Sequence, residues 1–366
     1  MVWSKSTHVK IIDMKFSEVS EKEFDKFERK QKVGNFFQST KRAELRRRMG
    51  YDTFLLGVTE KDKLLAVGML VVRDGEAWLQ LGPILNYDDK KVVEFFVDEL
   101  VKFAKDKEFT ALEIFPPVLL SVRDVHGEIL KNDEQSELFD VFDRLGFKYE
   151  GRTVRLENKA NRWMCIKDLS KFKDMDAVRA SFKKNVRNKL RKVKKELEVY
   201  VLKDKSELSE WIKPLNDSNE KNGVHGRNVK YYEDVWDIFG DEVQFMVVRK
   251  KENKELVSAR VVFYQPQETV TFVSGTIQKN RRLNGMTVLQ EWQMEECLKR
   301  GQKRLNFYGL EGDFSKENKL LEFKSGFGVE VEEYIGGFKM ILRPIKYYSN
   351  NLKKRIWGKV YHLIKR

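Results

Sequence analysis

The sequence predicts an α/β (α+β) protein in which one arrangement of strands and helices occurs twice. Segments with strand and helix character follow the order strand-strand-strand-helix-strand-helix-strand over residues 54–149, and the same order returns over residues 243–335. Repetition of a whole unit indicates duplicated domains, and the mixture of element types favours mixed sheets flanked by helices. The length of 366 residues also exceeds one ordinary hydrophobic core.

In the first copy, apolar runs of strand length alternate with two helices. Residues 90–105 carry Val, Phe and Leu at helical spacing, which is typical of an amphipathic helix. Gly146 can adopt the left-handed conformation that ends the second helix. The expected elements are strands at 54–58, 64–72, 77–81 and 111–115, helices at 90–105 and 136–145, and a strand that begins at residue 147.

The second copy repeats this pattern, and only the charged turn 250–255 joins its first two strands. Gly309 and Gly312 mark a turn after the fourth strand. The expected elements are strands at 243–249, 256–263, 269–275, 305–308 and 329–335, and helices at 285–300 and 320–324.

Outside the copies, the sequence predicts helices that are unusually basic. We expect a helix at 17–31 that Ser20 can cap, a turn at 34–39, a basic helix at 41–49 and an amphipathic basic helix at 185–195. The expected domains are a first α/β domain at 1–165, a second at 166–345 and a basic amphipathic C-terminal helix at 346–366.

The charge balance narrows the possible partners. A formal net charge of +14 attracts polyanions such as nucleic acid, anionic lipid headgroups or diphosphates. The presence of only two cysteines indicates a reducing compartment. Neither these cysteines nor the four scattered histidines have the spacing of metal ligands, so we expect no metal site. Because no apolar segment reaches bilayer length and the N-terminus lacks a signal-peptide core, we expect a cytoplasmic protein.

Lys324 is the first candidate for chemistry. It follows the short helix 320–324, beside the glycines at 326 and 328, where two expected strands converge. A lysine at such a turn is well placed to meet an anionic or polar group. The ordinary alternative is a solvated surface lysine.

Several motifs together carry a resemblance to a known family. They are GNFFQS at 34–39, the basic run at 183–195, NFYGLEGDF at 306–314, FKSGFG at 323–328 and YIGGF at 334–338. Over nearly its whole length the chain resembles the FemABX-type peptidyltransferases. The resemblance implies two tandem acetyltransferase-type (GNAT-like) domains that use no acetyl-CoA and no other cofactor. Some members carry an inserted coiled-coil arm, and the short turn 250–255 predicts that this chain lacks it.

The resemblance also implies a reaction. The aminoacyl group of an aminoacyl-tRNA would pass to the stem-peptide amine of a peptidoglycan precursor, either lipid II or UDP-MurNAc-pentapeptide, and so build the interpeptide bridge. Aminolysis of an ester requires a neutral amine, two positioned substrates and stabilisation of an oxyanion. It requires no enzyme nucleophile, and the sequence shows no Ser-His-Asp or Cys-His arrangement.

By motif position, individual residues acquire expected roles. Lys324 matches the family lysine that is proposed to stabilise the developing negative charge or the terminal tRNA phosphate. Arg46 and Arg227 match cations that bind the precursor's diphosphate, although Arg47 and Arg48 directly follow Arg46. The remaining expectations are Tyr308 and Phe323 framing the substrate site, with a core role as the alternative for each, and Asp313, Glu311 or the tRNA hydroxyl accepting the proton.

Basic residues outside this site are expected to bind the larger partners. The tail places Trp357 and Tyr361 among Lys and Arg, which favours peripheral contact with a membrane surface and a lipid-linked precursor. The expected tRNA-backbone contacts are Arg187, Lys189, Arg191, Lys192, Lys194 and Lys195.

Two rival functions remain open at this point. An acetyl-CoA-dependent N-acetyltransferase would carry a Q/R-x-x-G-x-G/A turn, and RLNGMT at 282–287 departs from that pattern only at Thr287. A non-enzymatic RNA- or membrane-binding protein would explain the charge but not the doubled fold. The sequence indicates neither the donated amino acid nor the oligomeric state.

Overall fold

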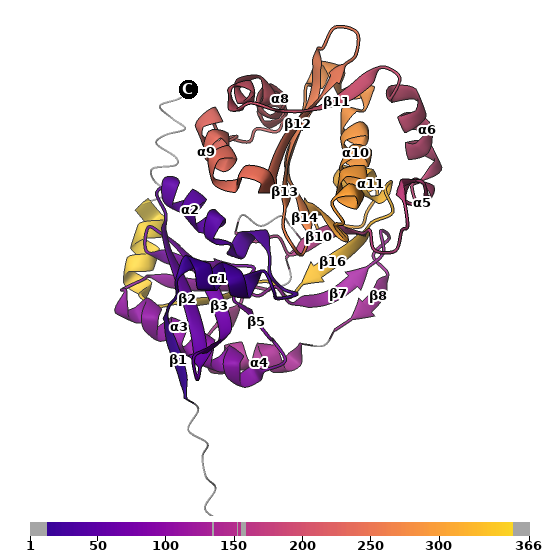
Figure 1. The fold of residues 1–366 in the computed structure, drawn as a ribbon. Helices are drawn as coiled ribbons and strands as arrows, with labels where there is room; N and C mark the ends of the chain where they lie inside the picture. The colour runs from indigo at the N-terminus through magenta and orange to yellow at the C-terminus, as the bar shows by residue number, and fades with distance from the viewer. Residues whose placement is uncertain (1–12, 134, 152, 155–158, 354–366) are drawn as a thin grey trace, which may run out of the picture.

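The computed structural model describes residues 13–133, 135–151, 153–154 and 159–353 and contains two mixed β-sheets with helices around them (Figure 1). Within these residues the first sheet has eight strands in the order β1-β2-β3-β4-β6-β17-β9, with β5 paired to β3. Its strands are β1 Met14–Glu18, β2 Asp52–Glu60, β3 Lys63–Arg73, β4 Glu76–Gln80, β5 Ile84–Leu85, β6 Ala111–Phe115, β9 Lys148–Tyr149 and β17 Phe338–Ile341.

The second sheet has nine strands within the same described residues, in the order β11-β12-β13-β14-β15-β10-β16-β7-β8. Its strands are β7 Leu119–Arg123, β8 Ile129–Asn132, β10 Trp163–Asp168, β11 Leu197–Val201, β12 Val243–Lys250, β13 Leu256–Tyr264, β14 Thr269–Thr276, β15 Arg304–Gly309 and β16 Glu330–Tyr334.

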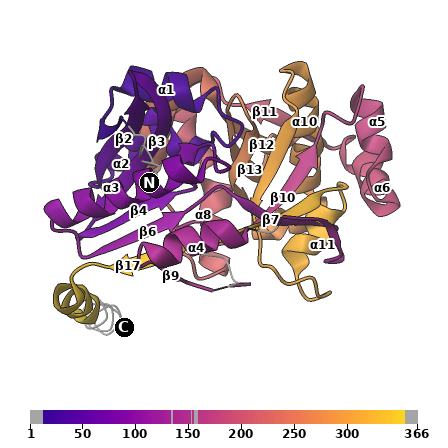
Figure 2. The same ribbon diagram turned by 90° about the horizontal axis from the view of Figure 1, so that it is seen from below.

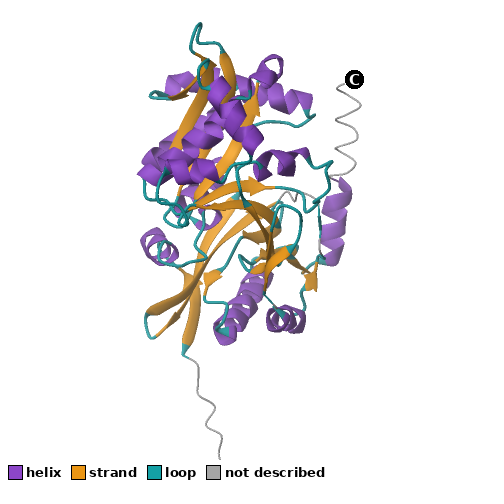
Figure 3. Cartoon of the chain, turned by 90° about the vertical axis from the view of Figure 1, so that its right-hand side faces the viewer, coloured by secondary structure: helices purple, strands orange, loops and turns teal. Residues whose placement is uncertain are grey.

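Helices flank the strands of both sheets, as the purple and orange elements of Figure 3 show. In Figures 1 and 2, α5 and α6 lie at the far end of the molecule from α3. The helices are α1 Glu21–Glu28, α2 Thr40–Arg48, α3 Lys90–Asp106, α4 Ser136–Arg144, α5 Met175–Ala180, α6 Lys184–Val193, α7 Leu208–Trp211, α8 Lys213–Lys221, α9 Val229–Phe239, α10 Gly285–Lys299 and α11 Lys319–Ser325.

Each sheet packs against one long helix that buries apolar side chains in its core. Phe96, Val97 and Leu100 of α3 are fully buried in the core of the first sheet. Leu289 and Met294 of α10 are fully buried in the core of the second. Burial of each such side chain contributes about 1.5–3 kcal/mol, so these two helices are fixed firmly to their sheets.

The two halves exchange strands. β10, which follows the first copy in sequence, lies between β15 and β16 of the second sheet. β17, which follows the second copy, lies between β6 and β9 of the first sheet. The boundary expected between residues 165 and 166 thus falls inside β10, and each sheet contains strands from both halves of the sequence.

A third apolar cluster joins the halves directly. Phe36 of the 3₁₀ turn Phe36–Gln38 is fully buried, and its ring centroid lies 4.2 Å from that of Phe263 in β13. Arg48 at the end of α2 pairs with Asp234 of α9 at 3.0 Å. The first half is therefore packed against the second through both apolar and charged contacts.

The central parallel pair of the second sheet separates early, unlike that of the first. β4 and β6 pair along five residues, whereas the β14–β15 pairing is limited to Thr269↔Leu305 and Val270↔Asn306. β14 continues to Thr276 and β15 to Gly309 without pairing further with each other. The backbone groups beyond the last pair face an opening between the two strands, which is where the candidate site lies.

The strands and helices expected in both copies are all present, with ends that differ by a few residues at most. The helix expected at 17–31 was too long: it begins at Glu21, because Met14–Glu18 pairs with β2 as strand β1. The direct connection from β12 to β13 through 251–255 confirms that no coiled-coil arm is inserted there.

The C-terminal tail is described only in part. Residues 344–353 are helical, and the expected helix residues beyond them, including Trp357 and Tyr361, lie outside the described residues. Among the described helices, none combines the length and the apolar character that a bilayer crossing requires.

Candidate active site

A cationic cavity of about 420 Å³ lies beside the opening between β14 and β15. Both halves of the chain line it: α2 and β4 come from the first half, and Phe272 of β14 and Tyr308 of β15 come from the second. Its charged lining residues are Arg42, Arg46, Arg73, Asp74, Glu76, Lys159 and Arg227. Because the cations outnumber the carboxylates, the cavity favours an anionic ligand.

The helical spacing of α2 determines which of its arginines line the cavity. Ser39 caps the helix by accepting a hydrogen bond from the Arg42 amide. Arg42 and Arg46 are four residues apart and share the inward face, because positions i and i+4 lie one above the other on a helix. Arg47 and Arg48 are exposed and pair with Glu44 at 3.0 Å. Of the three consecutive arginines, Arg46 alone lines the cavity.

The electrostatics of this face are unusual. Burial, together with the neighbouring Arg42 charge, lowers the pKa of Arg46 to about 10. Its Nη2 donates to Gln80 Oε1 at 3.3 Å, and its Nε has no hydrogen-bond partner. Arg227 lies at the exposed side of the same cavity, with its guanidinium 5.0 Å from the Tyr231 ring centroid. Arg46 and Arg227, the two cations expected to bind a diphosphate, thus line the same cavity.

Tyr308, the residue before the end of β15, has a backbone conformation that few tyrosines adopt. Its φ of 66° lies in the left-handed region, which costs of order 1–3 kcal/mol for a residue with a side chain. The Tyr308 amide donates to Asn306 Oδ1 at 2.8 Å, and its ring stacks on Phe37 with centroids 5.9 Å apart. This backbone turn directs the Tyr308 side chain into the cavity lining.

Lys324 supports that turn from beneath. It lies on α11, is only 5% exposed, and its Nζ donates to the carbonyl oxygens of Tyr308 at 3.0 Å and Gly309 at 2.8 Å. Burial lowers the pKa of Lys324 to about 8. A solvated surface position, the ordinary alternative in the sequence, is therefore excluded. Lys324 touches the strained turn but lines neither of the two cavities that flank it.

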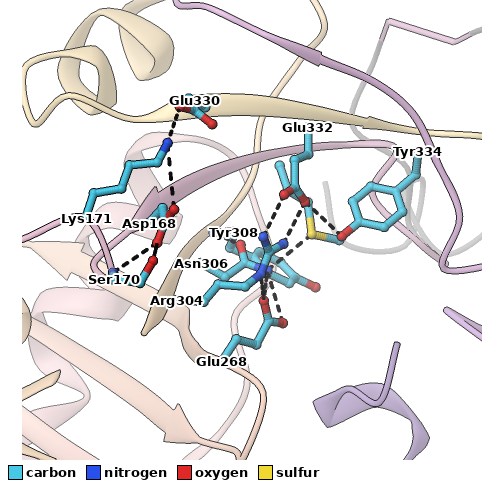
Figure 4. Close-up of polar contacts among 11 residues, drawn as sticks. Asp168, Ser170, Lys171, Glu268, Arg304, Asn306, Tyr308, Glu330, Glu332 and Tyr334 are labelled. Carbon is cyan, nitrogen blue, oxygen red and sulfur yellow. Dashed lines mark hydrogen bonds and ion pairs between the residues drawn. The ribbon is translucent and has the colours of Figure 1, made fainter. Parts of the chain in front are cut away.

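A buried charged network fixes the start of β15 (Figure 4). Arg304 donates to both carboxylate oxygens of Glu332 at 2.6 Å and to Glu268 at 3.0 Å. Asn306 donates from Nδ2 to Glu268 at 3.2 Å while its Oδ1 accepts the Tyr308 amide. A continuous set of polar contacts therefore connects β16 and Glu268, the residue before β14, to the Tyr308 turn.

A second cavity of about 360 Å³ lies where α10 begins. Gly285 and Thr287 of α10 line it, and Thr276 of β14 and Phe323 of α11 complete one side. The first turn of a helix presents free N–H groups and a positive dipole end, which suit an anion. Lys189, Lys221 and Arg281 add positive charge to the lining. Phe323 and Lys324 are adjacent in sequence, so the second cavity borders the lysine that supports the first.

The basic helix α6 has one buried apolar stripe, formed by Val186 and Leu190, and an exposed basic face. The six expected tRNA contacts are all exposed, but they do not form a single site. Lys189 lines the second cavity, whereas Arg187, Arg191 and Lys194 line a third cavity of about 500 Å³ beside α10. Lys194 Nζ also pairs with the buried Glu291 at 2.8 Å. Lys192 and Lys195 line neither cavity.

The expected proton acceptors lie away from the cavities. Both carboxylate oxygens of Asp313 accept from Ser315, through its amide and its hydroxyl, each at 2.9 Å. Glu311 is exposed and lines neither cavity. The carboxylates that do line the first cavity are Asp74 and Glu76, which the sequence did not single out.

Sequence reasoning also missed Arg42, Arg73 and Lys159. One signal was available for Arg42, because it precedes Arg46 by four residues and so shares its helix face. Arg73 and Lys159 enter the cavity from a strand end and from a loop. No local pattern marks such positions.

Comparison with known proteins agrees with this architecture. The profile of the FemAB family matches residues 19–251 and 248–355. The aminoacyltransferase FemA of Staphylococcus epidermidis is 26% identical over 423 residues, covering 93% of this chain and 99% of the relative. FemA of Staphylococcus aureus is 24% identical over 417 residues with the same coverage.

Solved structures show the same fold. A crystal structure of FemX has a TM-score of 0.77 at 18% identity, covering 91% of this chain and 99% of that one. A tandem GNAT protein from the clavulanic acid biosynthesis pathway has a TM-score of 0.53 at 9% identity, covering 90% and 98%. Because the family profile spans nearly the whole chain and FemA relatives align with it over most of its length, this protein belongs to the FemAB family and is an aminoacyltransferase.

Proposed function

We propose that this enzyme moves an amino acid from aminoacyl-tRNA to the stem-peptide amine of a peptidoglycan precursor and so builds the interpeptide bridge. The observation that carries the proposal is the pair of cationic cavities on either side of the Tyr308 and Lys324 contact. One cavity would hold an anionic acceptor and the other an anionic donor, with their reacting ends at the opening between β14 and β15. Because its donor is a tRNA ester, the enzyme would work in the cytoplasm.

The first cavity is assigned to the acceptor. Arg46 and Arg227 would bind the diphosphate that both forms of the precursor carry, since guanidinium groups make strong charge-assisted hydrogen bonds to phosphate. Tyr308 lines the same cavity and would contact the group next to the diphosphate.

A lipid-linked acceptor is favoured over a nucleotide-linked one by the C-terminal helix. Ile345, Tyr348 and Leu352 lie on one side of the helical residues 344–353 and are 89%, 61% and 59% exposed. Apolar side chains on one face of a basic helix are typical of contact with an anionic membrane surface. Such contact would hold the enzyme where a lipid-linked precursor is found.

The second cavity and α6 are assigned to the donor. The positive first turn of α10, with Lys189 beside it, suits the terminal phosphate of a tRNA, and Phe323 offers a ring against which a base can stack. The exposed basic face of α6 would contact the RNA backbone, which supplies affinity without base readout.

The chemistry requires little from the protein beyond positioning and charge. The amine attacks the ester carbonyl, the carbonyl carbon becomes tetrahedral, and the tRNA hydroxyl leaves. An ammonium has three N–H donors, and Lys324 uses two on the Tyr308 and Gly309 carbonyls. The third would stabilise the developing oxyanion. We assign the amine proton to the departing tRNA hydroxyl, because both carboxylate oxygens of Asp313 already accept hydrogen bonds from Ser315 and Glu311 is exposed.

A transfer assay tests the proposal directly. The enzyme is incubated with a panel of charged tRNAs and with lipid-linked or uridine-linked precursor in parallel, and mass spectrometry identifies the product. We expect addition of one kind of amino acid to the stem peptide, faster with the lipid-linked precursor in vesicles. Acetyl-CoA serves as the control donor. Acetylation of an amine from acetyl-CoA without any aminoacyl transfer would overturn the proposal.

A further inference from the structure

Arg42 is buried without a partner in the first cavity. Its residue surface is 4% exposed, and neither Nε nor Nη1 has a hydrogen-bond partner. Among the carboxylates of the described residues, none forms an ion pair with Arg42 or Arg46. A buried charge that lacks both a counterion and hydrogen bonds carries a large desolvation cost. Within the described residues, only the aromatic rings around the guanidinium offset part of this cost.

The surroundings of Arg42 hold it in place without satisfying it. Its guanidinium carbon lies 5.2 Å from the ring centroid of Phe36, 5.9 Å from that of Phe37 and 5.6 Å from that of Phe272. Aromatic faces attract a cation, but they offer no strong hydrogen-bond acceptor to its N–H groups. Nε and Nη1 are themselves covered by protein, but Arg42 lines the cavity and its side chain donates no hydrogen bond within the described residues, so the edge of the guanidinium that reaches the cavity can bind a ligand.

The contrast with the other arginines of α2 shows that this arrangement is specific to the inward face. Arg47 pairs with Glu21 and Glu44, and Arg48 pairs with Glu44 and Asp234. The outward arginines are thus neutralised by the protein, whereas the two inward ones are not. On α2, therefore, Arg47 and Arg48 form ion pairs within the protein, whereas Arg42 and Arg46 line the cavity.

We propose that Arg42 is a further anion-binding residue of this cavity, and that Arg42 and Arg46 together select two adjacent anionic groups, as in a diphosphate ester, over a single phosphate. One helical turn separates the two arginines, so each can bind one of two linked phosphates through its fork of donors. Arg227, at the exposed side, then binds the outer phosphate from the opposite half of the chain. The inference deepens the proposed function, because it rests on a diphosphate-bearing acceptor in this cavity.

Calorimetry with inorganic pyrophosphate and orthophosphate tests the inference on the full chain. We expect the wild-type protein to bind pyrophosphate at least ten-fold more tightly than orthophosphate. Arg42→Met should weaken pyrophosphate binding about ten- to a hundred-fold while changing orthophosphate binding little. Arg42→Lys should retain part of the affinity. Arg47→Gln is the matched control on the same helix, and it should bind both anions as the wild type does.

Thermal unfolding separates a ligand-binding role from a structural one. Because Arg42→Met removes an only partly compensated buried charge and keeps most of the side-chain volume, its ligand-free melting temperature should not fall below that of the wild type. Pyrophosphate should raise the melting temperature of the wild type and of Arg47→Gln, but not of Arg42→Met. Unchanged pyrophosphate affinity in Arg42→Met, or equal wild-type affinity for the two anions, would overturn the inference.

The transfer assay distinguishes failure of this inference from failure of the proposed function. If aminoacyl transfer occurs but pyrophosphate binding does not depend on Arg42, only the role of Arg42 is wrong. If pyrophosphate binds as expected but no aminoacyl group is transferred from any charged tRNA, the diphosphate site stands and the proposed reaction is wrong.

Discussion

At the scale of single residues, the site depends on side chains held in unfavourable states. Tyr308 has a left-handed backbone, and Lys324 is a buried ammonium bonded only to carbonyl oxygens. Arg42 is buried and Arg46 is half-buried, and neither forms an ion pair with a carboxylate of the described residues. Natural proteins retain such costs where function requires them. The concentration of these states around one cavity is therefore a physical argument for function, independent of any motif.

The pH dependence of transfer tests the ammonium role of Lys324. Burial lowers the pKa of Lys324 to about 8, so the side chain loses its charge as the pH rises through this range. We expect wild-type transfer, corrected for spontaneous ester hydrolysis, to stop rising above about pH 8, because loss of the Lys324 charge then opposes the gain from deprotonation of the acceptor amine. Lys324→Met should lower transfer by about a hundred-fold below pH 8, the typical loss for one oxyanion donor, and by less above it. Wild-type rates in Lys324→Met would show that the lysine has no such role.

The same lowered pKa of Lys324 predicts that its contribution to stability changes with pH in the direction opposite to its contribution to transfer. Between about pH 8 and 10.5 the unfolded chain binds a proton on Lys324 that the folded protein has lost. The contribution of Lys324 to the free energy of unfolding therefore rises with pH across this window. Urea unfolding of the wild type and Lys324→Met should show a difference in stability that changes in this direction. A pH-independent difference would contradict the lowered pKa.

At the scale of elements, the position of a residue on its strand or helix decides which partners its side chain contacts. Strand β16 illustrates this, because Glu330 and Glu332 lie on the same strand two residues apart (Figure 4). Glu330 pairs with the exposed Lys171 at 2.9 Å, whereas Glu332 is buried and binds Arg304 through both oxygens. The two glutamates look alike in the sequence, but we expect their contributions to the free energy of unfolding to differ.

Substitution of the two glutamates makes this difference measurable. Glu332→Gln removes the bidentate ion pair of Arg304, which is partly exposed and keeps Glu268, and should lower the free energy of unfolding by about 2 kcal/mol. Glu330→Gln removes only an exposed pair and should change it by about 0.5 kcal/mol or less. Urea unfolding at constant pH provides the measurement. Equal effects of the two substitutions would mean that the Arg304 network contributes little to the fold.

Helix α6 makes a second prediction at this scale. Lys192 and Lys195 are exposed on or just after this helix, so removal of their charges should not disturb the core. The double variant Lys192→Gln/Lys195→Gln should bind all tRNAs more weakly and should reduce the slope of log affinity against log salt by about 0.7–0.9 per lysine. Lys102→Gln on α3 is the control. An unchanged salt slope in the double variant would place the tRNA elsewhere.

At the scale of the whole molecule, strand exchange joins the two copies into one folding unit. β10 and β17 each pair inside the sheet that is formed mainly by the other half, and Phe36 is buried against β13. The first cavity takes its lining from both halves. Its geometry therefore depends on how the copies are fixed relative to each other.

Unfolding experiments test this coupling. We expect one cooperative transition in urea with the same midpoint for probes in both halves. Trp78 reports on the first sheet and Trp211 on the helices beside the second, so single-tryptophan variants that retain one or the other are suitable probes. Separate midpoints would show that the exchanged strands do not couple the halves.

Much of this structure was predictable because periodicity is a local property. The strands and helices of both copies follow from apolar spacing, as in residues 90–105 and 243–249. The short strands β10 and β17 were not predicted, because their partners lie more than a hundred residues away along the chain. Arg42 was missed for a related reason: its isolation depends on which carboxylates the fold leaves out of reach.

The sequence by itself determined the type and order of the main elements within the two copies, the duplicated plan and the family, because these depend on spacing and motif within short segments. The tertiary structure decided which strand enters which sheet and which arginines of α2 face the ligand space. It also decided that Lys324 supports a strained turn instead of lying on the surface. The physical reason is that burial and charge pairing depend on neighbours brought together across the whole chain.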